Sequence, residues 1–191
     1  MIDGSGRQSL LSLVLIAGIG FSLIAAPGLD GLLGAFLAAL MLAIAIIDSR
    51  RYIIPNELTA AALALALLRA GAVGPDAGWD AMAWAVFRAA SVALPLLALM
   101  AGYRRWRGRD GLGLGDIKLA AVAGAWLGFV TIFAVIELAA LSALAAYAVN
   151  AYWRKRPLKA TAFLPFGLFL APAIWLGWLA ETMLDWTSLG F

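Results

Sequence analysis

The sequence predicts an all-α, polytopic membrane protein, and three observations support this prediction. Of its 191 residues, 64% are hydrophobic and 13% are charged, whereas a soluble domain has about 25% charged residues. The apolar residues form six long runs separated by short polar segments. A helix needs about 20 apolar residues to cross the hydrocarbon of a bilayer, and helices satisfy their own backbone polar groups in lipid.

Each apolar run predicts a membrane helix, but the fifth is too long for one crossing. It contains Gly124 and Gly128, and basic residues flank it on both sides. Because basic loops stay in the cytoplasm, we expect this run to cross twice, turning near these glycines, with a short or re-entrant first arm. The runs are Leu10–Ala26, Leu32–Ile47, Leu58–Val73, Ala81–Gly102, Ile117–Asn150 and Phe163–Leu184.

We therefore expect seven transmembrane helices, within a range of six to eight, with the N-terminus in the cytoplasm and the C-terminus outside. Of 14 basic residues, all except Arg69 and Arg88 then fall at the cytoplasmic face. An alternative is that Leu10–Ala26 is a cleaved signal peptide, although it exceeds the usual apolar length of about 7–15 residues. Residues 1–191 are predicted to form a single membrane-embedded domain, without a soluble domain.

The absence of cysteine and histidine removes several kinds of site. Zinc sites built from these residues, disulfides, and Ser-His or Cys-His catalysis are all excluded. Catalytic groups would have to come from Asp, Glu, Lys, Ser, Thr or Tyr. We expect no metal and no cofactor. The basic residues lie in short loops between apolar runs, which predicts contact with membrane lipid and no nucleic-acid partner.

Two acidic residues differ from the rest in position. Asp48 ends the second run and Asp116 opens the fifth; two crossings separate them, so both belong to one membrane face. Two carboxylates at similar depth can share a proton, and such a pair can activate water and protonate a leaving amine. The alternative is structural, with Asp116 as a helix N-cap and Asp48 paired with Arg50 or Arg51.

Helix polarity gives a hypothesis for the roles within this pair. Asp116 begins a helix, where the dipole favours a carboxylate, and Asp48 ends one, where it favours the acid. By this reasoning Asp116 is the ionised base and Asp48 holds the shared proton.

The residues around both aspartates resemble the type IV prepilin peptidases. Positions 48–59 read Asp-Ser-Arg-Arg-Tyr-Ile-Ile-Pro-Asn-Glu-Leu-Thr, similar to the first aspartate motif of that family. Positions 113–116 read Gly-Leu-Gly-Asp, similar to its GxGD motif, with Gly-Ala-Trp-Leu-Gly following at 124–128. Positions 163–167 contain the Pro-Phe-Gly segment found near the C-terminus of family members.

The resemblance implies an aspartyl endopeptidase that cleaves the leader of prepilins or pseudopilins at the cytoplasmic face of the bacterial inner membrane, using Asp48 and Asp116. The partner is then a prepilin or pseudopilin substrate helix; the oligomeric state is left open. Long members also carry an insert with paired cysteines linked to N-methylation. This chain resembles the short, peptidase-only form of tight-adherence (Flp-type) pilus systems, so we expect no methyltransferase activity.

Neighbouring residues are predicted to shape the site. Gly113 and Gly115 leave room for substrate backbone beside the second aspartate, with loop flexibility as the alternative. Pro55 and Asn56 end an extended linker and cap the following helix. Lys118 either stabilises charge at the site or anchors the chain at the cytoplasmic face.

Arg88 and Glu137 are the other ionisable residues predicted inside the membrane. We expect them to form a structural pair, since an unpaired intramembrane charge is costly; a proton-relay role for Glu137 is the alternative.

Three other functions compete with the peptidase. One is a proton-coupled transporter, although both aspartates lie at one face and transporter sites lie near the midplane. The second is a serine-lysine peptidase using Ser49 and Lys118. The third is a non-catalytic pilus or secretion assembly factor.

Overall fold

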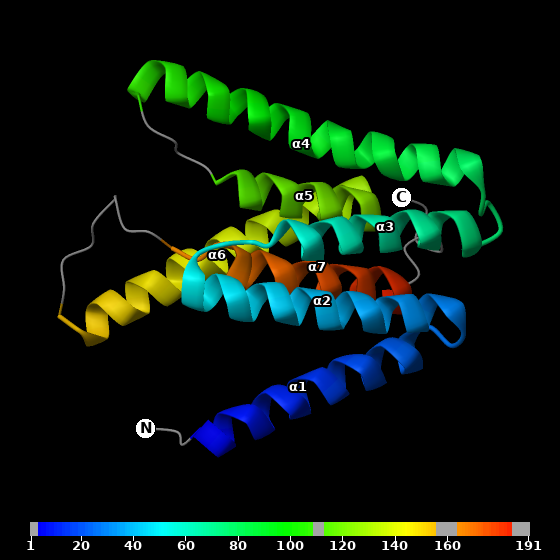
Figure 1. Cartoon of the computed structure of the whole chain (residues 1–191), viewed down its shortest axis with the longest axis horizontal. Coiled ribbons are helices and arrows are strands. Elements are labelled where there is room, and N and C mark those ends of the chain that lie inside the picture. The colour runs from blue at the N-terminus through cyan, green and yellow to red at the C-terminus, as the bar shows by residue number, and fades with distance from the viewer. Residues whose placement is uncertain (1–3, 109–112, 156–163, 185–191) are drawn as a thin grey trace.

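The computed structural model describes residues 4–108, 113–155 and 164–184. These residues form seven α-helices and no strand (Figure 1). Three of the basic residues used to predict topology, Arg109, Arg156 and Lys159, lie outside the described residues. The helical bundle confirms the predicted fold class. The helices are α1 (Gly4–Ala25), α2 (Leu29–Arg51), α3 (Asn56–Ala72), α4 (Trp79–Arg107), α5 (Leu114–Trp126), α6 (Phe129–Trp153) and α7 (Gly167–Leu184).

Successive helices run in alternating directions through the bundle (Figure 1). α2 ends, and α3, α5 and α7 begin, at the left of Figure 1, and we call this the carboxylate end because Asp48 and Asp116 lie there. The turns that join α1 to α2 and α3 to α4 lie at the other end, which we call the opposite end. The predicted turn near Gly124–Gly128 is confirmed, since α5 ends at Trp126 and α6 begins at Phe129.

The shortest helix, α5, lies at the centre of the bundle. It has 13 residues and packs against α3, α4 and α7. Most of its side chains are buried, whereas α4, with 29 residues, buries Ala85 alone among its described side chains. Most of the largest fully buried side chains come from α2, α5, α6 and α7, including Leu37, Met41, Trp126, Ile132 and Trp178.

Apolar side chains also cover the outside of the bundle. Leu13, Ile24, Leu94, Val130 and Phe133 each expose more than half of their surface, which would be unfavourable in water. Five of the described helices, α1, α2, α4, α6 and α7, are long and apolar enough to cross a membrane, and α3 and α5 fall short of that length. A lipid environment explains the exposed apolar surface.

Local backbone chemistry ends the helices at the carboxylate end. α2 stops because Tyr52 adopts the left-handed conformation, with φ 55°, and its N–H bonds to the carbonyl of Asp48 at 2.9 Å. Pro55, which has extended backbone, precedes α3, but Asn56 is the first residue of the helix and no described side chain caps it, so the predicted cap by Asn56 is wrong. α4 ends at Gly108, whose φ of 67° suits a residue without a side chain.

The contact between α2 and α7 depends on a glycine. The indole ring of Trp178 occupies the space where a Cβ on Gly34 would lie. Trp178 is fully buried and packs edge-to-face on Trp126 of α5, with 6.5 Å between ring centroids. A side chain at position 34 would therefore force α2 and α7 apart beside α5.

We predict that Gly34→Ala lowers the stability of the bundle by about 1–3 kcal/mol, the usual range for overpacking a core. Gly20→Ala is the matched control, because a Cβ there meets nothing within 4 Å and alanine is the better helix former by about 1 kcal/mol. Thermal unfolding in detergent, followed by tryptophan fluorescence, measures both. Equal midpoints for the two variants would contradict this packing.

Candidate active site

Asp48 lies in the last turn of α2, where it is 4% exposed. Its Oδ2 accepts a hydrogen bond of 2.9 Å from the backbone N–H of Leu168, in the first turn of α7. The first N–H groups of a helix have no partner within the helix, and a carboxylate there also meets the positive end of the helix dipole. The N-terminus of α7 therefore holds the Asp48 carboxylate in a fixed position.

Gly167 makes this contact possible. A Cβ on Gly167 would lie 3.0 Å from Oδ2 of Asp48 and 2.8 Å from Cδ1 of Ile54. A side chain would have to displace one of these groups before the helix could approach the carboxylate. This glycine belongs to the Pro-Phe-Gly segment, and in the structure its neighbour is Asp48.

Asp116 lies in the first turn of α5 and is partly buried. Its backbone N–H bonds to the carbonyl of Gly113 at 3.1 Å, and a Cβ on Gly113 would lie 3.0 Å from its Oδ2. The carboxylate therefore folds back over Gly113, as in a helix N-terminus stabilised by its own acidic residue.

Ile54 links the two aspartates. It is buried, and it lies against Gly167 beside Asp48 and against Gly115, where a Cβ would be 3.0 Å from its own Cβ. The space beside Gly115 is therefore filled by Ile54, so this glycine serves packing, whereas the sequence had predicted room for substrate. Ile54, in the linker between α2 and α3, thus packs against the glycines that lie beside the two aspartates.

The two carboxylates act on each other electrostatically. Burial, and secondarily the charge of Asp48, raise the pKa of Asp116 to about 6, against a small opposing effect of the backbone at Gly113. Asp116 lies in α5, which is not one of the five helices that are long enough to cross a membrane. A second negative charge near the first is unfavourable, so a pair of this kind retains one proton above the ordinary titration range of a carboxyl group.

Lys118 and Asn56 join α5 to α3 next to the site. Nζ of Lys118 donates a hydrogen bond of 2.7 Å to Oδ1 of Asn56, the first residue of α3. The Ser49 hydroxyl donates to the carbonyl of Ile46 in its own helix, at 2.8 Å. In the described structure, neither side chain forms the Ser49–Lys118 hydrogen bond that a serine-lysine peptidase would need.

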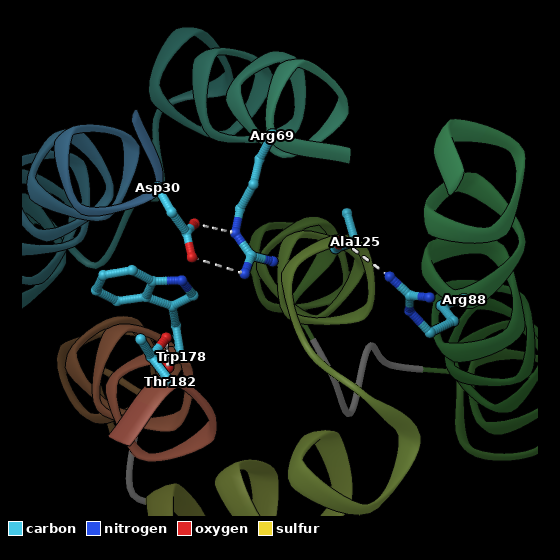
Figure 2. A network of polar contacts seen from close by, with 6 residues as sticks. All are labelled: Asp30, Arg69, Arg88, Ala125, Trp178 and Thr182. Carbon is cyan, nitrogen blue, oxygen red and sulfur yellow. Dashed lines mark hydrogen bonds and ion pairs between the residues drawn. The ribbon is translucent and has the colours of Figure 1, made fainter. Parts of the chain in front are cut away.

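The predicted pair of Arg88 and Glu137 is wrong. Arg88 instead donates from Nε to the carbonyl of Gly124 at 3.2 Å. Its Nη2 donates to the carbonyl of Ala125 at 3.5 Å, the contact that Figure 2 shows. Glu137 is exposed on α6. Carbonyls at the end of a short helix are alternative partners for an intramembrane cation, and the sequence-based prediction considered only side chains.

An ion pair that the sequence did not predict lies at the opposite end. Nε of Arg69 is 2.6 Å from Oδ1 of Asp30, and Nη2 is 3.3 Å from Oδ2, a two-point contact between α3 and α2 (Figure 2). Asp30 lies between the first two apolar runs, so a topology with the N-terminus in the cytoplasm places it on the same side of the membrane as Arg69. Among the described residues, no three acidic side chains gather as a metal site would require.

The fold and these contacts define a class: a helical membrane protein with two interacting carboxylates at one end of its bundle. Comparison with known proteins identifies the family. Residues 35–149, which include Asp48 and Asp116, match the type IV leader peptidase family. This match covers more than half of the chain, so the protein belongs to that family, and the resemblance seen in its motifs is confirmed.

Curated relatives agree with this assignment. A prepilin leader peptidase/N-methyltransferase of Burkholderia pseudomallei (strain 1026b) is 38% identical over 150 residues, which cover 73% of this chain and 43% of the relative. A prepilin leader peptidase/N-methyltransferase of Aeromonas hydrophila is 28% identical over 194 residues, which cover 98% of this chain and 63% of the relative. Leader peptidase HopD of Escherichia coli is 35% identical over 127 residues, which cover 66% of this chain and 78% of the relative. The chain thus spans less than two thirds of the first two relatives. No solved structure matches it.

The coupling of the two aspartates can be tested without substrate. We predict that Asp48→Asn lowers the pKa of Asp116 below its value of about 6, because the Asp48 charge that raises it is removed while an amide oxygen can still accept the Leu168 N–H. Infrared titration of the carboxyl C=O stretch measures this pKa, with Asp116→Asn identifying the band. An unchanged midpoint would show that the two carboxylates do not interact.

Proposed function

We propose that this protein is a membrane aspartyl endopeptidase that removes the leader peptide of a prepilin or pseudopilin. The observation that carries the proposal is the pair of carboxylates: Asp48 is buried, Asp116 is partly buried, and the charge of one acts on the other. Two carboxyl groups in this relation can divide the tasks of general base and general acid between them. The relatives of Burkholderia pseudomallei and Aeromonas hydrophila are named prepilin leader peptidases, which supports prepilins as the substrate class.

We assign the ionised carboxylate to Asp48 and the shared proton to Asp116, the reverse of the assignment based on helix polarity alone. The hydrogen bond from Leu168 to Asp48 supports it, because an N–H donor at a helix N-terminus favours a carboxylate. Burial and the charge of Asp48 raise the pKa of Asp116 to about 6, so Asp116 keeps its proton to a higher pH than an ordinary carboxyl group does. Asp48 therefore meets two helix ends. The positive end of the α7 dipole favours its carboxylate, and the negative end of the α2 dipole disfavours it.

The proposed reaction then follows from these two protonation states. The Asp48 carboxylate removes a proton from water, whose oxygen attacks the scissile carbonyl carbon, while Asp116 gives its proton to the carbonyl oxygen. The resulting tetrahedral diol collapses as Asp48 passes its proton to the leaving nitrogen and Asp116 regains a proton from a diol hydroxyl. One water is consumed, the C–N bond breaks, and both carboxyl groups return to their starting states.

We further propose that the carboxylate end faces the cytoplasm from the bacterial inner membrane, with the N-terminus on the same side. The described basic side chains support this orientation, because all except Arg69 and Arg88 belong to segments at that end. Those two are instead engaged in polar contacts near the opposite end. We propose peptidase activity without N-methylation, since the chain has no cysteine; the tight-adherence subtype stays a prediction.

We predict that Asp48→Asn and Asp116→Asn each lower cleavage by at least about 10²-fold, the usual contribution of one general acid or base. Ser49→Ala should retain activity, because its hydroxyl bonds only to its own helix in the described structure. The assay is cleavage by the purified protein in detergent of a peptide with a basic leader and an apolar helix. Mass spectrometry with S-adenosylmethionine present should show an unmethylated product. Cleavage that survives both aspartate changes would exclude the aspartyl mechanism.

Orientation can be measured in a chain that has no native cysteine. We predict that Trp106→Cys, in the last turn of α4, is protected from a membrane-impermeant maleimide in intact cells, whereas Asp76→Cys, in the exposed turn between α3 and α4, reacts. Both positions should react after the cells are opened. The reverse pattern in intact cells would invert the proposed topology.

A further inference from the structure

α5 is too short to span a membrane. Its 13 residues extend about 20 Å, against about 30 Å of hydrocarbon. Its last residue, Trp126, and the following Leu127 are both buried, so the helix ends inside the bundle. The final carbonyls of a helix have no partner within it, and in a buried or lipid setting each unpaired group is costly.

Side chains from the neighbouring helices satisfy this helix end. Arg88 of α4 donates to the carbonyls of Gly124 and Ala125. Arg69 of α3 lies on the other side of α5 from Arg88 (Figure 2), 5.6 Å from the ring centroid of Trp126. Two cations thus flank the negative end of the α5 dipole.

The start of α6 receives the complementary charge. Oε1 of Glu181, on α7, accepts a hydrogen bond of 2.8 Å from the backbone N–H of Gly128, immediately before α6. Glu181 is also the carboxylate whose charge acts on Arg88. The turn between α5 and α6 is therefore held by a cation from α4 and an anion from α7.

Backbone packing fixes the same point. A Cβ on Gly124 would lie 2.8 Å from the carbonyl oxygen of Arg88 and 2.8 Å from Cα of Ala89. α4 and α5 therefore touch backbone to backbone beside the Arg88 hydrogen bonds. Such a contact has one good register, because shifting either helix would separate both the packed atoms and the hydrogen bonds.

We propose that Arg88 and Glu181 are positioning residues for Asp116: they hold the far end of α5 at one depth and so fix the height of its carboxylate beside Asp48. This inference rests on the proposed aspartyl peptidase. Asp116 and Ala125 are joined by a continuous helix and lie roughly 14 Å apart along its axis, so a shift at one end is transmitted to the other.

The electrostatic surroundings make such a shift measurable. Asp48 of α2 is the charged group that acts on Asp116. At this end α7 contributes the backbone N–H of Leu168, which binds Asp48. α3 contributes the side-chain amide of Asn56, which accepts a hydrogen bond from Lys118 of α5. Three arginines of α4 and two basic residues after α6 also belong to this end: Arg104, Arg105, Arg107, Arg154 and Lys155. Moving α5 away from α2 would weaken the effect of Asp48 on Asp116.

The experiment compares Arg88→Met with Glu137→Gln in the full-length protein. For Arg88→Met we expect kcat to fall by up to about 10²-fold, the usual cost of a misplacement of about 1 Å, with KM unchanged. The alkaline limb of the pH–rate profile, where Asp116 loses its proton, should move to lower pH. Glu137→Gln should match the wild type, since Glu137 is exposed on α6. Arg88→Lys should recover part of kcat, because it keeps the charge without the planar fork.

Two results would overturn the inference. If Arg88→Met reduces only the amount of folded protein and leaves the alkaline limb in place, Arg88 is merely structural. If Glu137→Gln moves that limb as far as Arg88→Met does, Arg88 acts through the Glu137 pair first predicted from the sequence, and the contacts at the end of α5 do not position Asp116. Infrared titration of Asp116 in Arg88→Met gives the same readout without substrate. A failed cleavage assay would therefore reject the proposed function while still deciding whether Arg88 positions Asp116.

Discussion

The hydrogen bond from the Leu168 backbone to the Asp48 carboxylate determines how the carboxylate end is built. A buried carboxylate is stable only when it has hydrogen-bond donors, and the first turn of a helix offers N–H groups that lack other partners. α7 must therefore begin at the level where α2 ends. Gly167 lets it approach this closely, because a Cβ would press on Asp48 and Ile54. The catalytic proposal and the packing of α2 against α7 thus depend on the same contact.

The shortness of α5 explains most of the remaining polar structure. A helix that ends inside a membrane protein needs partners for its last carbonyls, and Arg88 supplies them while Glu181 binds the backbone that begins α6. Charged residues near the middle of membrane helices are often assigned to transport or proton relay. In this bundle Arg88 binds carbonyls at the end of α5 and Glu181 binds the backbone that begins α6, and the proposed chemistry lies at the other end of α5.

Sequence reasoning succeeded where a local pattern carries the information. The fold class followed from apolar runs and few charges, and the location of Asp48 and Asp116 at one end of the bundle followed from their positions at run ends. It failed for Arg88, since a sequence shows which side chains could pair and gives no account of the carbonyls exposed by a truncated helix. The proposed protonation roles differ from those inferred from helix polarity, because the sequence indicated the dipole of α2 at Asp48 but not that of α7.

The sequence by itself therefore determined the lipid environment, the helical class, the family motifs and the two acidic residues, because composition and spacing along one chain are enough to specify them. The tertiary structure decided which groups face these residues. Leu168 lies 120 positions from Asp48 in the chain, and Arg88 lies 36 positions from Gly124. Contacts of this kind arise from the packing of whole helices and from the need to satisfy buried backbone groups, so no short segment of sequence encodes them.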